Sequence, residues 1–219
     1  MAEPRQAGTL ARTHEGQPGL PRGRSSLPQQ DVRASQRRRL LRSAIAVVSE
    51  SGYHQVTVAD IVRRARVSRG AFYEHFANKQ VCFLEAYEQM TAAFIQASLD
   101  AAGPLPGWRE KLHAGISTYF DWMAAHPEVA ISTVVEVHGA GREALEARSR
   151  ALRLWMRTLE GVAVLARRSG ASVEPPRAAY QAIVLTAEAE VHEYARGGRV
   201  KQVAERAAPV VELADSLYV

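Results

Sequence analysis

Apolar residues fall at helical spacing along most of this chain, and aromatic residues are few. Leu41, Ile45 and Val48 form an i, i+4, i+7 stripe, which predicts a helix from near Val32 or Ala34 to residue 51. Gly52 follows as a C-cap glycine, since glycine ends a helix in a left-handed conformation without a steric penalty. The pattern therefore predicts an all-α protein that begins with this helix.

Glycine and proline divide the rest of the chain into further helical stretches. Asn78 is a candidate N-cap for a long helix, and the Gly- and Pro-rich run 103–107 stops that helix. His126 precedes Pro127, and the residue before a proline is disfavoured in helical conformation. The helices predicted after Asn78 are residues 79–102, 108–125, 127–138, 142–168, 175–195 and 200–217. With the helix before Gly52 and two shorter ones, the predicted total is nine.

The first of the shorter helices follows residue 56 and has two start signals. Thr57 is a candidate N-cap, and Asp60 stands three residues later, as in a capping box. Val56 is placed to close over Ile61 as a hydrophobic staple. The helix has room for only about two turns before the next cap. So short a helix is not stable alone, and it must pack on its neighbour.

The second short helix repeats these start signals. Ser68 is its candidate N-cap, and Val67 has the staple spacing to Phe72. Phe72 and Phe76 are four residues apart, so they share one face of the helix, which we expect to pack on the core. Two such helices joined by a turn of about three or four residues form a helix-turn-helix.

The opposite edge of this second helix is narrow and polar. Its first turn holds only small or polar residues around Arg69, so it could approach a major groove closely, where the guanidinium would bond guanine O6 and N7 together. Tyr73, His75 and Lys79 follow around the rim, and their donors suit phosphate oxygens. Taken singly, each of these is ordinarily a solvated or half-buried side chain. Their joint spacing behind two caps predicts contact with duplex DNA.

A wider motif carries these residues: Gly52-Tyr53, Thr57-Val58, Asp60-Ile61, Ala65, Val67-Ser68-Arg69-Gly70, Phe72-Tyr73, His75-Phe76 and Asn78-Lys79. It resembles the DNA-binding domain of TetR-family transcriptional regulators. The resemblance implies phosphate contacts from Thr57, Tyr73, His75 and Lys79 and base contacts from Ser68, Arg69, Gly70 and Ala71. Two positions depart from the family pattern. Arg66 replaces a common Gly, so we expect it to adopt a left-handed conformation at some cost. Ala71 replaces a common Thr and would offer a thymine methyl only apolar contact.

The formal charge of +5 is concentrated at the front of the chain. Residues 1–42 contain nine Arg and three acidic residues, a net +6, while residues 43–80 carry +2 and residues 81–219 carry −3. A polyanion would therefore bind at the front. Four arginines there would suit phosphates flanking a groove, or simply form a solvated face: Arg37, Arg38, Arg39 and Arg42.

Residues 1–30 are rich in Gly, Pro, Gln, Ser and Arg, and they have few large apolar side chains. They are expected to form a disordered basic tail, because they bury too little apolar surface to offset the entropy of ordering. Its arginines either lie along DNA or in a minor groove, or they form a solvated extension.

The single cysteine, Cys82, excludes an internal disulfide and suits a reducing cytosol. We expect Cys82 in the core at the start of a helix. No apolar run approaches the ~18 residues of a membrane span, and the N-terminus has no signal-peptide apolar region. A cytoplasmic location without membrane contact is expected.

Residues 80–219 combine apolar walls with a few polar side chains, which is typical of a small-molecule pocket and also of an ordinary helical core. The resemblance implies a pocket for a partly apolar effector. The candidate ligand-binding residues are Tyr87, Phe94, Trp108, Phe120, Met123, Glu136, Trp155, Glu188 and His192. No metal site is predicted, because Glu188 and His192 lack further ligands at a metal-binding spacing. Without a GxSxG, P-loop or GxGxxG motif, we expect neither an enzyme nor a cofactor.

The last two predicted helices have extended faces of small and apolar residues: Ala178, Ala179, Ala182, Ile183, Leu185 and Ala189, then Val203, Ala207, Val210, Val211, Leu213 and Ala214. An intramolecular core could use these faces. A terminal helix pair more often docks on its twin in a four-helix bundle about a two-fold axis, and the resemblance implies the same homodimer. A dimer would present two recognition helices about one DNA turn, ~34 Å, apart.

The sequence thus predicts a disordered basic tail (residues 1–30), a helix-turn-helix DNA-binding domain (31–79) and a helical effector-binding and dimerisation domain (80–219). By resemblance, the dimer is a transcriptional repressor on a palindromic operator, and a small molecule releases it by swinging the helix 79–102. Two alternatives stay open. One is a constitutive or architectural DNA-binding regulator without an effector. The other is a small-molecule-binding protein or enzyme with an unused helical head.

Overall fold

The computed structural model describes residues 28–170 and 175–218, and all regular structure in these ranges is helical. The nine α-helices described are α2 (Gln29–Ser51), α3 (Val58–Ala65), α4 (Arg69–His75), α5 (Lys79–Ala102), α6 (Trp108–Ala125), α7 (Pro127–Ala130), α8 (Arg142–Arg168), α9 (Arg177–Arg196) and α10 (Ala207–Ser216). A π-helix, η1 (Ile131–Val135), and two 3-10 segments, η2 (Glu136–Gly139) and η3 (Val200–Arg206), complete the set. The all-α prediction is confirmed. The predicted tail lies outside the described residues, apart from its last three.

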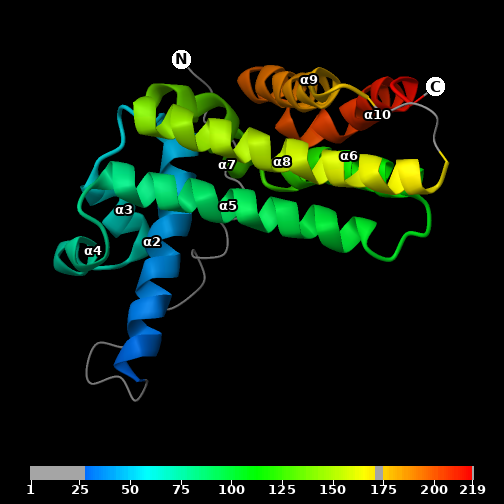
Figure 1. The fold of residues 1–219 in the computed structure, drawn as a ribbon. Helices are drawn as coiled ribbons and strands as arrows, with labels where there is room; N and C mark the ends of the chain where they lie inside the picture. Colours follow the sequence, from blue (N-terminus) through cyan, green and yellow to red (C-terminus); the bar gives the residue numbers. More distant parts are fainter. Residues whose placement is uncertain (1–27, 171–174, 219) are drawn as a thin grey trace.

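The first three helices gather at one end of the molecule, and the remaining helices extend away from them (Figure 1). The long α5 begins in this head and runs beside α8, and its 24 residues give a rod of about 36 Å. α6 packs on α5 and α8, while α9 and α10 lie on the side of α8 and α6 away from α5. The helix α5 therefore connects the head to the distal end of the larger helical part.

The predicted caps account for the sharp helix starts in the head. The Thr57 hydroxyl accepts from the Asp60 N–H at 3.3 Å, and the Asp60 carboxylate accepts from the Thr57 N–H at 2.9 Å. Ser68 Oγ accepts from the Ala71 N–H at 3.1 Å. Asn78 Oδ1 likewise accepts from the first turn of α5 at 2.9 Å. Each cap satisfies an N–H that has no partner within its helix, as predicted.

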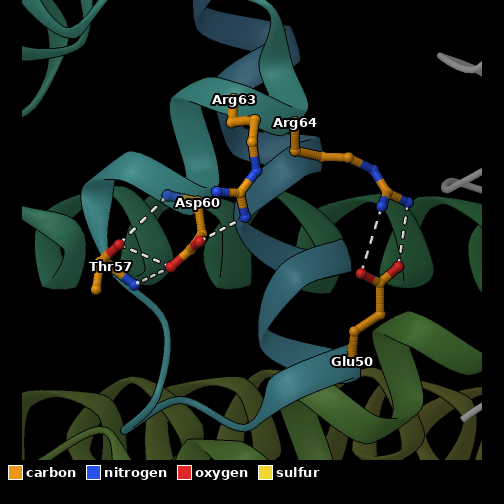
Figure 2. A network of polar contacts seen from close by, with 5 residues as sticks. All are labelled: Glu50, Thr57, Asp60, Arg63 and Arg64. Atoms are coloured by element: carbon orange, nitrogen blue, oxygen red, sulfur yellow. Dashed lines mark hydrogen bonds and ion pairs between the residues drawn. The ribbon is translucent and has the colours of Figure 1, made fainter. Parts of the chain in front are cut away.

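The turn between α3 and α4 depends on Arg66. Its φ of 53° and ψ of 46° are left-handed, as predicted from its place in the motif. An ion pair also fixes the adjoining helix, since Arg64 of α3 bridges to Glu50 of α2 at 3.1 Å (Figure 2). Figure 2 shows the Thr57–Asp60 cap on the other side of α3, where Arg63 bonds the same carboxylate. The short helix is therefore held at both ends and along one side.

Two hydrophobic clusters fill the interior. The first is built on Leu40, Ile45, Phe72, Phe76 and Phe83, and it also contains residues of α7, η2 and the start of α8. The second cluster lies among α5, α6, α8, α9 and α10. Cys82 is fully buried in the first cluster, as expected, and burial raises the pKa of its thiol to about 12. Because the first cluster includes residues on both sides of position 79, the predicted domain boundary there stays a prediction.

Three predicted helices differ clearly from the structure, and α9 begins two residues and ends one residue later than the predicted 175–195. α2 starts at Gln29, earlier than predicted. Its first turns are polar, so no apolar periodicity in the sequence indicated them. The predicted helix 127–138 is divided among α7, η1 and η2, in a run of β-branched residues that have low helix propensity. The predicted helix 200–217 is divided into η3 and α10. Pro209 lacks an N–H, so it fits only the first turn of α10 and cannot lie within one continuous helix.

Candidate nucleic-acid interface and effector cavity

The exposed edge of α4 contains the residues predicted to read bases, with one exception. Ser68, Arg69 and Gly70 are exposed, and Tyr73 is 48% exposed one turn later. The Arg69 guanidinium lies 5.8 Å from the centroid of the Tyr73 ring, so the two side chains lie together on this edge. A Cβ at Gly70 would meet only Ser68 Oγ, at 3.9 Å, so the protein itself does not require glycine there. The edge is therefore free to approach another molecule closely.

The base contact predicted for Ala71 stays a prediction, and Ala71 differs from its neighbours on this edge in its exposure. Ala71 is only 9% exposed and lies beside the fully buried Phe72. Its methyl group is therefore much less accessible than the side chains of Ser68 and Arg69. The motif spacing did not reveal this, because a seven-residue helix changes from exposed to buried within one residue.

Lys79 has partners within the protein. Its ammonium donates to the carbonyl of Tyr53 at 2.9 Å and to the carbonyl of Val56 at 2.8 Å, and it lies 4.5 Å from the Tyr53 ring centroid. Both carbonyls belong to the loop between α2 and α3. Lys79 therefore fixes that loop to the start of α5, and at most one ammonium proton remains for a phosphate.

Thr57 and His75, also predicted to contact phosphates, have structural partners as well. The Thr57 hydroxyl is exposed but donates to Asp60 Oδ2 at 2.7 Å, and these bonds hold the pKa of the Asp60 carboxyl below its usual value. His75 is half-buried, and burial together with the nearby Arg37 and Arg33 lowers its pKa. The imidazole is therefore neutral near pH 7, and it would contact a phosphate as a neutral donor only.

The arginines at the start of α2 divide into two groups. Arg37 bonds the Glu85 carboxylate through Nε at 2.9 Å and lies 4.8 Å from the Phe76 ring centroid. Arg39 is only 9% exposed, and its burial lowers its pKa. Arg38 and Arg42 are exposed and one turn apart. These last two are the members of the group that face solvent.

A small inner cavity lies in the larger helical part of the chain, and part of the predicted ligand set lines it. Its volume is about 50 Å³. The predicted residues that line it are Tyr87, Phe94, Met123, Trp155 and Glu188, and the sequence did not single out Val129, Ala151 or Leu152, which also line it. The space holds only a few water molecules, at ~10–15 Å³ for each.

Glu188, which lines the cavity, takes part in an ion pair with Arg148. Arg148 Nε donates to Glu188 Oε1 at 2.8 Å, and Glu188 is only 6% exposed. Burial raises the pKa of the neighbouring Tyr87 and Tyr119 hydroxyls above their usual range, and the Glu188 carboxylate adds to this effect. The tyrosines are therefore neutral, and Glu188 is already balanced by an arginine.

Four of the predicted ligand-binding residues lie outside this cavity. Phe120 is fully buried in the core, and the Trp108 ring packs against Tyr218 with centroids 4.7 Å apart. His192 lies near His138, at 6.2 Å between ring centroids. Glu136 accepts from the Tyr53 N–H at 2.9 Å, so it joins η2 to the head. No local pattern in the sequence distinguishes such contacts from pocket positions.

A second space, larger than the inner cavity, was not predicted from the sequence. It is a groove of about 430 Å³ between the end of α5, the start of α6 and the second half of α8. Trp155 is the one predicted residue that lines both the groove and the inner cavity. Gly115 and Gly161, which lie within long helices, were the signals in the sequence that could have indicated it.

Two kinds of site are not found in the described part of the chain. Residues 28–170 and 175–218 contain no group of three or more His, Cys, Asp or Glu placed to hold a metal ion. No helix within the same ranges combines the length and the apolar character that crossing a membrane requires.

Two capped helices around a left-handed turn, with an exposed arginine-bearing edge, define a helix-turn-helix DNA-binding protein. Residues 40–86 match the family model described as bacterial regulatory proteins, tetR family. The part of the chain that this model matches is a TetR-family DNA-binding domain.

Similar curated proteins are regulators. The fatty acid metabolism regulator protein of Bacillus subtilis is 27% identical over 123 residues, covering 56% of this chain and 63% of that protein. The probable acrEF/envCD operon repressor of Escherichia coli is 38% identical over 85 residues, covering 36% of this chain and 39% of that protein. The chain thus aligns with less than two thirds of the length of either relative.

Solved structures extend the likeness over most of the fold. The fatty acid degradation regulator FadR from Bacillus halodurans has a TM-score of 0.75 at 22% identity, covering 81% of this chain and 93% of that one. FadR from Bacillus subtilis, solved in complex with stearoyl-CoA, has a TM-score of 0.72 at 24% identity, covering 80% and 96%. At these identities the likeness shows the fold.

Proposed function

We propose that this chain is a homodimeric transcriptional repressor that binds a palindromic operator and releases it when a small molecule binds the second domain. One observation carries the proposal. Arg69 and Tyr73 lie exposed and side by side on a helix whose start is fixed by the Ser68 cap, in a head that belongs to a DNA-binding family.

In this proposal α4 enters the major groove. Arg69 bonds a guanine, and the absence of a side chain at Gly70 lets the backbone approach the bases. Tyr73 donates to a phosphate and fixes the register. Arg38 and Arg42 of α2 supply further exposed positive charge for the backbone. Lys79 has a positioning role, because its ammonium holds the α2–α3 loop.

The proposed dimer interface is the outer face of α9 and α10. Ala178, Ala182, Leu185 and Ala189 are exposed at spacings of four, three and four residues, and Leu185 is 41% exposed. Leu213 of α10 is 38% exposed. Other residues of the predicted faces are buried within the chain: Ala179, Ile183, Val203, Val210 and Ala214. A stripe of this kind suits a four-helix bundle with a second copy.

The effector in this proposal is a partly apolar compound with an acyl chain. The apolar lining of the inner cavity and of the groove supports this class. The proteins that point the same way are the fatty acid metabolism regulator of Bacillus subtilis, by its name, and the FadR structure, by its bound stearoyl-CoA.

The segment from η1 to η2 offers a physical route from the cavity to the head. Thr133 and Val134 of η1 line the inner cavity. The neighbouring Ser132 donates to the Ile45 carbonyl of α2 at 2.8 Å, and Glu136 accepts from the Tyr53 N–H. A ligand that prefers one arrangement of this segment would shift the head and α5, and thereby the separation of the two recognition helices.

The test is retardation of the DNA upstream of the chain's own reading frame, with and without acyl compounds. We expect a salt-sensitive specific complex that an effector dissociates. A specific complex that no bound compound weakens would contradict the effector part of the proposal. Failure to retard this or any other promoter fragment would contradict the DNA-binding part.

A second candidate function is a DNA-binding regulator without an effector. The small volume of the inner cavity, about 50 Å³, favours this alternative, because a drug-sized ligand needs ~300 Å³ or more. The groove favours the first candidate. The same titration decides between them.

A further inference from the structure

The groove lies at the end of the second domain far from the head. It is lined by the last turns of α5, the first half of α6 and the second half of α8, and its volume of about 430 Å³ is within the range of ligand sites. In Figure 1 this region is the end of the parallel pair α5 and α8 away from α3 and α4. The groove is therefore separate from the DNA-binding edge.

Two glycines line the groove although the protein does not need them there. Gly115 of α6 is buried, yet a Cβ built on it meets no atom within 4 Å. Gly161 of α8 is exposed, and a Cβ built on it also meets no atom within 4 Å. Glycine destabilises a helix interior relative to alanine, so it normally has a steric or conformational reason. At Gly52 the reason is a φ of +81° and Glu136 close by. At Gly115 and Gly161 the fold supplies no such reason, and the glycines leave the space open.

A buried hydroxyl in the same groove has no partner. Ser98 is 2% exposed, lines the groove, and its Oγ has no hydrogen bond to any described residue. A buried polar group without a partner is destabilising, so native proteins nearly always satisfy it. The Ser98 hydroxyl is thus available to a ligand that enters the groove.

The lining specifies both parts of such a ligand. Leu99, Leu154 and Leu165 are exposed large apolar side chains on its walls, at 48%, 42% and 38%. Among the described residues that line it, the charged ones are Lys111 and Arg157, and both are cationic. Lys111 uses two donors on the carbonyls that end α5, at 2.9 and 3.0 Å, while the exposed Arg157 has a guanidinium available. An apolar chain with an anionic head complements this surface.

We infer that the groove binds the alkyl chain of an anionic single-chain amphiphile, with its head group at Arg157 and Lys111. The inference rests on the proposed function and assigns the effector site to this groove rather than to the inner cavity. Trp155 lines both spaces, and its ring lies at 32° to the Tyr119 ring with 4.3 Å between the centroids. An alkyl chain in contact with Trp155 would therefore affect the inner cavity, and through it η1, without occupying that cavity.

Calorimetric titration of the full chain with dodecanoate and with dodecanoyl-CoA tests the inference. The two probes share a chain and an anionic charge, so their relative affinities identify the head group. Gly161→Leu fills the groove from an open position, and we expect it to weaken binding at least ~10-fold, because it takes up apolar space. Gly115→Ala should weaken binding less while raising the melting temperature. The matched control, Ala151→Val, narrows the inner cavity and should leave affinity unchanged.

The charge of the head group is tested separately. Arg157→Gln should weaken both anionic probes several-fold and leave the binding of neutral dodecanol unchanged. Gly161→Leu should keep full DNA binding without ligand, which shows that it remains folded. Undiminished probe binding by Gly161→Leu, or loss of binding in Ala151→Val alone, would overturn the inference. If the wild type retards DNA but binds neither probe, this inference fails while the DNA-binding function stands.

Discussion

Lys79 offers the sharpest test of a role that the structure assigns differently from the motif. Substitution Lys79→Met keeps the apolar stem and removes two charge-assisted hydrogen bonds, to Tyr53 O and Val56 O, together with the contact over the Tyr53 ring. Such bonds contribute ~1.5–3 kcal/mol each when buried. The site is part-buried and water would replace some of this, so we expect a total loss of about 1–2 kcal/mol.

Urea unfolding at fixed protein concentration measures this loss. With a slope of ~2 kcal/mol/M, the midpoint should fall by about 0.5–1 M. The control is Lys201→Met, which changes an exposed lysine of η3 and should leave the midpoint unchanged.

DNA binding by the same variant separates the two roles. A lost phosphate contact lowers the slope of log K against log salt by ~0.9, whereas a loosened loop weakens binding without changing that slope. We expect the second result. An unchanged unfolding midpoint with a slope reduced by about one would show that Lys79 is a phosphate ligand and would refute the reasoning.

Three further predictions concern the DNA edge, the dimer and the head. Arg69→Ala should weaken specific binding by ~1–3 kcal/mol and relax one base position, which a panel of single-base operator changes would detect. Leu185→Glu should convert a micromolar dimer to monomers in sedimentation, since it places a charge in the proposed bundle; a wild-type monomer would contradict the interface. The lowered pKa of His75 means that the folded state resists protonation while the unfolded chain titrates near pH ~6.5. The free energy of unfolding should therefore decrease as the pH drops below about 6.5. The decrease should be less steep in His75→Gln, and the same pH dependence in both proteins would contradict a contribution from His75.

Local signals in the sequence were sufficient for the head. Thr57, Ser68 and Asn78 act on an N–H within three residues of themselves, so spacing alone identifies them, and each is a cap in the structure. Two helices ended by proline signals were also predicted with their observed limits: α5 before the Gly- and Pro-rich run 103–107, and α6 before His126-Pro127. These features depend on neighbours along the chain.

Features that depend on distant partners were not predictable in the same way. The hydrogen bond from the Tyr53 N–H to Glu136 joins positions 83 residues apart. Because of this bond, Glu136 contacts the head, although it was predicted to line the ligand pocket. The π-helix η1 lies against α2, where Ser132 bonds the Ile45 carbonyl, and no local pattern indicates this. A glycine within a helix, such as Gly161, can be found in the sequence. That it lines an open groove could be seen only from the structure, where a Cβ at this position meets no atom.

The central claim is that two exposed edges, paired by symmetry, read duplex DNA. Selection of binding sites from a random duplex library by the full chain tests this most directly, with Arg69→Ala carried through in parallel. We expect enrichment of an inverted repeat with half-sites about one helical turn, ~34 Å, apart, and loss of one base preference in each half-site with Arg69→Ala. Enrichment of no sequence, or of the same sequence by both proteins, would contradict it.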